Sequence, residues 1–104
     1  MEVPKVKTLF NSTGSGNNVS YLNDEDITKY RTVIFQIINQ NGACHASHSM
    51  PVSTWQLYSN GNYPCSFYAF DGASHCNAYV QYVSRTKFHY AVTSPFGLRI
   101  FATT

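Results

Sequence analysis

The sequence predicts an all-β protein, an antiparallel β-sandwich of jelly-roll-like type with about eight short strands. Three observations lead to this fold class. Apolar and polar residues alternate with a period of two, helical periodicity is nearly absent, and dipeptides typical of hairpin turns separate the apolar runs. Strands that recur about every 8–12 residues between such turns are typical of sandwiches and barrels.

Three strands are expected in the N-terminal third. Alternation over residues 3–10 predicts the first, and Asn17–Leu22 is a second short strand after the Ser/Gly/Asn-rich loop Asn11–Asn18. Arg31–Ile38 is a mainly apolar run rich in β-branched residues, and it is too short for a confident helix. This run predicts a central strand buried on both faces.

Three more strands are expected toward the C-terminus. Cys76–Ser84 alternates with Tyr79 and Gln81 on one face and Ala78, Val80 and Tyr82 on the other. Lys87–Val92 and Gly97–Ala102 alternate in the same way, and the last strand places Leu98, Ile100 and Ala102 together. Each of these segments therefore offers one apolar face to a core.

Turn signals separate these strands. Asn41-Gly42, Asn60-Gly61 and Asp71-Gly72 predict hairpins, because Asn, Asp and Gly tolerate the positive φ that two-residue turns need. Ser94–Gly97 predicts a turn with Pro95 at its second position. Asp24 is expected to cap a helical turn that begins at Ile27.

Composition excludes several classes of protein. Only 12% of the 104 residues are charged while 15% are aromatic, which is the opposite of a disordered chain. No apolar stretch reaches the roughly 18 residues of a membrane helix, and the seven basic residues are scattered, so neither membrane insertion nor nucleic-acid binding is expected. One domain over residues 1–104 is expected, with residues 1–4 as a flexible arm.

The order of the segments carries a resemblance to a known group of proteins. A Ser/Gly/Asn loop precedes Val19-Ser20-Tyr21-Leu22, Met50-Pro51-Val52-Ser53 lies in mid-chain, and the chain closes on Gly97-Leu98-Arg99-Ile100-Phe101. This order, from Lys5 to Ala102, resembles small β-sandwich modules of tailed-bacteriophage virion proteins, found in tail fibres, tail tips, head fibres and capsid decorations. The chain departs from that pattern by carrying three Cys and four His between Cys44 and His89.

The resemblance implies a structural, non-enzymatic virion protein, assembled in the host cytoplasm, that acts in virion assembly or host-surface attachment. It implies a homotrimer whose partners are other virion proteins and a host surface glycan or receptor. The composition agrees in kind, because a surface of Ser, Thr, Asn and Tyr with few charges suits repeated protein packing or sugar contact.

The Cys and His residues give the candidate metal ligands Cys44, His48, Cys65 and Cys76. Zinc takes thiolate and imidazole ligands, but the chain has no Cys-x-x-Cys and no His-x-His, and Cys44-x3-His48 is the only close pair with reach. The alternative is that the cysteines are small buried apolar residues. A disulfide between Cys65 and Cys76, on either side of the Asp71-Gly72 turn, is a further alternative. No metal and no cofactor is expected.

Catalysis is not expected, because no nucleophile motif or convincing carboxylate pair is present. Most aromatics fall at strand spacing and are expected in the core, including Phe67/Phe70, Tyr79/Tyr82 and Phe88/Tyr90. Trp55, Tyr58 and Tyr63 instead flank the Asn60-Gly61 turn and are the candidate contact residues for a sugar or a protein partner. The alternative for Trp55 is that it plugs the end of the sandwich. A carbohydrate-binding β-sandwich is therefore the second functional hypothesis.

Overall fold

The computed structural model describes residues 5–23, 25–59, 65–72 and 74–104. It contains eight strands: β1 (Val6–Ser12), β2 (Gly16–Leu22), β3 (Thr32–Ile38), β4 (Cys44–Pro51), β5 (Cys65–Asp71), β6 (Ser74–Ser84), β7 (Lys87–Val92) and β8 (Gly97–Thr103). Three short helical segments connect them: η1 (Ile27–Lys29), α1 (Val52–Trp55) and η2 (Gln56–Ser59). The expected arm over residues 1–4 lies outside the described residues.

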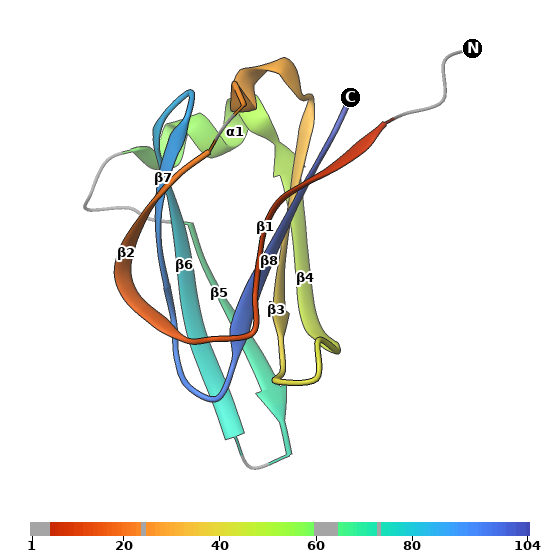
Figure 1. Cartoon of the computed structure of the whole chain (residues 1–104), viewed down its shortest axis with the longest axis vertical. Coiled ribbons are helices and arrows are strands. Elements are labelled where there is room, and N and C mark those ends of the chain that lie inside the picture. Colours follow the sequence, from red (N-terminus) through yellow and green to blue (C-terminus); the bar gives the residue numbers. More distant parts are fainter. Residues whose placement is uncertain (1–4, 24, 60–64, 73) are drawn as a thin grey trace.

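The strands form two four-stranded antiparallel sheets that pack face to face (Figure 1). One sheet has the order β1-β8-β3-β4 and the other has the order β2-β7-β6-β5. The predicted antiparallel β-sandwich is therefore confirmed. As in a jelly roll, β1 pairs with β8 and β2 pairs with β7. By contrast, β3–β4 and β5–β6 are simple hairpins.

The alternation of the predicted strands is confirmed in the burial of their side chains. Ala78 and Val80 of β6 and Phe88 of β7 face inward and meet Val33 and Phe35 of β3 across the sandwich core. β8 contributes Leu98, Ile100 and Ala102, all fully buried, as expected from the sequence. The core therefore takes every second residue of the inner strands.

The interpretation of Arg31–Ile38 as a strand buried on both faces is wrong in one respect. Val33, Phe35 and Ile37 are fully buried, but Ile34 and Gln36 lie half-buried on the outer face of the sheet. No second layer covers that face among the described residues; Ile34 instead pairs across the strands with Phe101. A cross-strand neighbour in the same sheet can bury part of an outward side chain such as Ile34 without a further layer of structure.

Two of the predicted hairpin turns are confirmed. Gly42 (φ 82°) and Gly72 (φ 61°) have positive φ at the tips of the β3–β4 and β5–β6 hairpins, a region that L-residues with side chains adopt at a cost. The Asn39 side chain accepts from the backbone N–H of Asn41 and Ala43, which fixes the first turn. The Asn60-Gly61 turn lies outside the described residues.

Two local predictions are shifted along the chain. Asp26, and not Asp24, caps η1, and its side chain accepts from the Thr28 backbone N–H at 2.9 Å; Asp24 lies outside the described residues. The turn before β8 begins at Thr93, whose carbonyl accepts from the Phe96 N–H at 2.9 Å, so Pro95 is its third residue. The Asp26 side chain satisfies a backbone N–H in the first turn of η1 that has no partner within the helix.

β4 and β5 are not among the strands expected from alternation, and both lie at the edge of a sheet. β4 reads CHASHSMP, and its small polar residues alternate only weakly with apolar ones. An edge strand is buried less than a central one, so its sequence is less constrained toward a clear pattern.

Candidate functional site

Trp55 is not an exposed contact residue. Its side chain is fully buried, its ring packs against Phe35 and Tyr82 at 5.2 and 5.4 Å, and its Nε1–H donates to the Val80 carbonyl at 3.3 Å. α1 places it at one end of the sandwich, between the two sheets (Figure 1). The structure therefore favours the alternative in which Trp55 closes that end. The Tyr58 side chain and all of Tyr63 lie outside the described residues, so their contact role stays a prediction.

The suggested Cys65–Cys76 disulfide is wrong. In the β5–β6 hairpin Cys65 pairs with Val80, while Cys76 pairs with Ala69, so the two cysteines are offset by four residues. Four residues of strand span about 13 Å, far beyond the Cα separation of a disulfide. Cys76 is a free, buried thiol, and burial raises its pKa, although hydrogen bonds with Thr93 act in the opposite direction.

The candidate zinc ligands are not brought together. Cys44 is exposed on β4 of one sheet, whereas Cys76 is buried on β6 of the other. His48 lies exposed on β4, and the Cys65 side chain is outside the described residues. Within the described ranges, no three His, Cys, Asp or Glu side chains are close enough to hold a metal ion.

The carboxylates next to η1 hold a turn together. Tyr30 donates its hydroxyl proton to Glu25, and this hydrogen bond, followed by Lys7 and Lys29, holds the pKa of Glu25 below its usual value. Hydrogen bonds from Thr28 likewise lower the pKa of Asp26, with a smaller contribution from Arg85. Both carboxylates are thus ionised acceptors in structural contacts, with ion pairs to Lys7 and Arg85 at 3.9 and 3.8 Å.

The outer face of the β2-β7-β6-β5 sheet is the best candidate for a functional site. It carries three aromatic residues, Tyr68, Phe70 and Tyr79, because they share the outward phase of β5 and β6. Tyr68 and Phe70 are 64% and 69% exposed, which is unusual for rings on regular strands. We call this surface the aromatic face; its polar members are Ser20, Ser66, His75, Asn77, Gln81 and His89.

Strand register fixes the layout of the aromatic face. Tyr68 pairs with Asn77, Phe70 with His75, and Ser66 with Tyr79. Tyr68 and Tyr79 are therefore diagonal neighbours on two strands, roughly 7–8 Å apart, and Phe70 continues the row along β5. Two of the rings thus follow β5 and the third lies on β6, with the amide and imidazole groups on the β6 and β7 side of the β5 rings.

Hydrogen-bonding groups continue from these rings toward β2. His89 on β7 pairs with Gln81 on one side and with Ser20 on the other. The Ser20 hydroxyl and His89 Nδ1 are 2.6 Å apart, which holds the imidazole in place. Among the described side chains, no Asp, Glu, Lys or Arg belongs to this central part of the face; Lys87 lies at its end, opposite Leu22.

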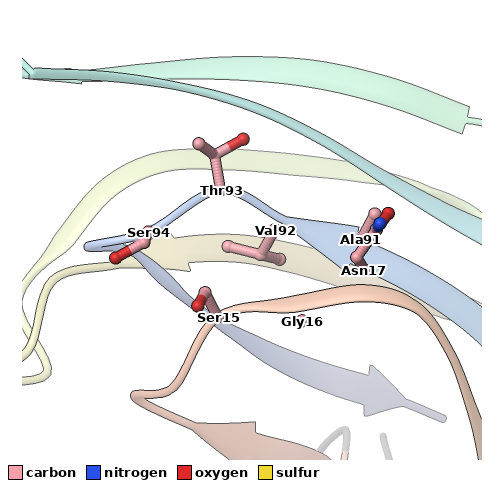
Figure 2. A pocket seen from close by; sticks show the side chains of 7 residues that line it. All are labelled: Ser15, Gly16, Asn17, Ala91, Val92, Thr93 and Ser94. Atoms are coloured by element: carbon pink, nitrogen blue, oxygen red, sulfur yellow. The ribbon is translucent and has the colours of Figure 1, made fainter.

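A shallow hollow adjoins the aromatic face at the β2–β7 end of the sheet. Figure 2 shows its lining, which is small and uncharged, with a volume of about 380 Å³. The lining residues are Ser15, Gly16, Asn17, Ala91, Val92, Thr93 and Ser94. The strand register shifts between Gly16 and Val19 at this point, so β2 bends where the hollow forms.

The sequence pattern groups the residues of this face but does not say which group is exposed. Phe70 was expected in the core because it is aromatic and at strand spacing, and that prediction is wrong. Ser66, Tyr68 and Phe70 share one phase of β5, and Ala69, in the other phase, is buried. The phase of a strand decides which residues are buried, and the partner strand is what sets the phase.

Comparisons with family models, with curated proteins and with solved structures found no match in any of the three. The class of protein is thus given by the fold itself, an antiparallel β-sandwich with an aromatic sheet face that exposes Tyr68 and Phe70 to solvent. In the described part of the chain, no helix is long and apolar enough to span a membrane.

Proposed function

We propose that this protein is a non-enzymatic structural module of a bacteriophage virion, in a tail, fibre, tip or capsid decoration, and that the aromatic face is its contact surface. The order of sequence segments that resembles such modules supports the virion assignment. The single observation that supports a contact role is the exposure of Tyr68 and Phe70 on a face without central charges. Aromatic enrichment with depletion of charge is typical of the core of protein interfaces.

The physical argument concerns the free energy of keeping large apolar side chains in contact with water. Two large exposed rings contribute only weakly to the fold. Covering them would release water from apolar surface, which is worth about 25 cal/mol per Å². Serine, asparagine and glutamine around the rings supply donors and acceptors at a contact rim. Such a surface is better suited to contact with a partner protein than to permanent exposure to water.

The experiment is co-assembly with the products of neighbouring genes. The chain is expressed with them, particles are purified by density gradient, and its presence in the particle fraction is quantified. A Tyr68→Ser/Phe70→Ser variant should be reduced in that fraction by at least about tenfold, whereas Leu57→Ser, an equally exposed apolar position on η2, should not. Absence of the unaltered chain from every particle fraction would refute the virion assignment.

The homotrimer implied by the resemblance stays a prediction. Light scattering on the purified chain measures it directly, because three copies of an 11.7 kDa protein differ clearly in mass from one or two.

A second candidate function is carbohydrate binding, located on the aromatic face and not at Trp55. The observation that favours it is the row of exposed rings next to amide side chains and the uncharged hollow of Figure 2. Aromatic rings stack on the apolar faces of sugars, while amides and hydroxyls bind sugar hydroxyls. On a glycan array, Tyr68→Ala and Phe70→Ala should each lose binding that Leu57→Ala retains; an array without hits would remove this candidate.

A further inference from the structure

The four edge strands of the sandwich are protected to different degrees against pairing with another chain. β1 and β4 are the edges of one sheet, and β2 and β5 are the edges of the other. Edge strands expose ladder N–H and C=O groups, and natural proteins block them with bulges, lysines, prolines or glycine breaks. The four edge strands can therefore be compared by the presence or absence of these protective features.

Three of the edges carry such devices. The β1 ladder shifts register between Thr8 and Phe10, and Lys7 lies on this strand. The β2 ladder shifts after Gly16, and the β3–β4 ladder shifts between Ile37 and Ile38. β4 also ends in Pro51. A strand that added to β1 or β2 would meet a break within the ladder, and one that added to β4 would meet the shift at its first residues and Pro51 at its last.

β5 carries none of them. All seven of its residues pair with β6 in one unbroken register, from Cys65 with Val80 to Asp71 with Ser74. Its sequence, CSFYAFD, contains no Lys, Pro or Gly and has a single charged residue at its end. β4 approaches β5 across the sandwich, but no ladder joins the two strands in the described structure. A regular edge of this kind, with large apolar side chains and no such feature, is a site for strand addition.

We propose that β5 is a self-association edge, where β5 of a second copy adds antiparallel across a two-fold axis. The two four-stranded sheets then form one continuous sheet of eight strands. A second copy is the occupant that the observations favour, because β5 in its central register is complementary to itself. Tyr68 then lies opposite Tyr68 of the second copy, and Phe70 lies opposite Ser66.

This register suits both the side chains and the charges. Cross-strand aromatic pairs stabilise antiparallel sheets, and the Tyr68 pair would lie at the centre of the contact. Asp71 falls opposite Cys65 and not opposite another Asp71, so the two like charges are held at opposite ends of the new ladder. The aromatic faces of the two copies become a single surface, which doubles the area available to a partner.

The inference does not depend on the virion assignment. It gives a dimer where the resemblance implies a homotrimer, so the first experiment measures the mass of the purified chain and decides between the two. Sedimentation or light scattering of the purified chain should give about twice 11.7 kDa at micromolar concentration. Tyr68→Lys would place two ammonium groups opposite each other and should weaken the dimer by at least about tenfold. Leu22→Lys, equally exposed on β2 at the other edge of the same sheet, should leave it unchanged. A monomer or a trimer of the unaltered chain would overturn the proposal.

A second experiment tests the register and separates this contact from binding through the aromatic face. In a background with Cys44 and Cys65 replaced by Ser, Tyr68→Cys should form an intermolecular disulfide, because directly opposed strand residues have Cα atoms about 4.5–5.5 Å apart. Phe70→Cys should not, because the two copies of that residue are offset by four positions, about 13 Å. Equal cross-linking of both variants would show that contact is made in another way, even if virion assembly were retained.

Discussion

The two outer faces of the sandwich are built from equally regular strands, but their exposed side chains have different partners. On the β1-β8-β3-β4 sheet, Arg99 donates to the Gln36 side chain at 2.8 Å and to the Gly42 carbonyl at 3.3 Å, and it lies 5.5 Å from the Phe101 ring centroid. On the other sheet, the rings of Tyr68 and Phe70 remain more than 60% exposed.

This difference distinguishes the exposed side chains that stabilise the fold from those that are available to bind a partner. The Arg99 face is covered by contacts within its own chain, so its side chains contribute to folding. The aromatic face leaves large side chains exposed, so they contribute to folding only weakly and are available for a partner. Four predictions test this contrast, from the largest expected effect to the smallest.

The largest effect is expected from a residue that is buried between the two sheets. Trp55 contacts Phe35 of one sheet and the Val80 carbonyl of the other. Trp55→Ala should lower the free energy of unfolding by about 3–5 kcal/mol, because it removes a fully buried indole and leaves a cavity. Urea unfolding followed by far-UV circular dichroism measures this; a loss below 1 kcal/mol would mean that the Trp55 site is less tightly packed than the structure shows.

The contrast itself is tested by a pair of substitutions. Arg99→Met removes two hydrogen bonds and leaves the side-chain oxygen Oε1 of Gln36 without this donor, so we expect a loss of about 1–2 kcal/mol in urea unfolding. Tyr68→Ala should change stability by no more than about 0.5 kcal/mol, because the ring is mostly exposed. Equal losses in the two variants would contradict the division between the faces.

The third prediction concerns acid and the carboxylates next to η1. The folded-state pKa values of Glu25 and Asp26 lie below their ordinary values of 4.5 and 3.8. Their contribution to stability is therefore present above those values and is lost as pH falls through the lower folded-state pKa values. A Glu25→Gln/Asp26→Asn variant should show a flatter fall in urea midpoint between pH 5 and about 2 than the unaltered chain. An identical pH profile would assign the acid sensitivity to other groups.

The smallest effect is expected for thiol labelling. Cys44 is exposed on its edge strand, so iodoacetamide should modify it in the native protein. Cys76 is fully buried between the sheets, and burial raises its thiol pKa, so it should remain unmodified until urea unfolds the chain. Peptide mass spectrometry after native labelling distinguishes the two sites, and early modification of Cys76 would indicate local opening of β6.

Much of the fold could be predicted because it depends on local chemistry. Alternation in Cys76–Ser84 and Gly97–Ala102 separated inward from outward residues correctly, since the side chains of a strand point to opposite faces whatever its partner is. Gly42 and Gly72 marked their hairpins, because positive φ is a property of single residues. The candidate site could not be predicted in the same way. Trp55 and Phe70 are both large and aromatic, and only the surrounding elements buried one and exposed the other.

By itself the sequence determined that this chain is an antiparallel β-sandwich with few charges and many rings, because period-two alternation and turn residues act over two to eight positions. Tertiary structure alone decided which strands are edges, that Cys65 and Cys76 are offset by four residues, and that Tyr68 and Phe70 remain in solvent. These outcomes depend on pairings between strands far apart in the chain, and a shift of one residue in such a register exchanges the buried and exposed faces.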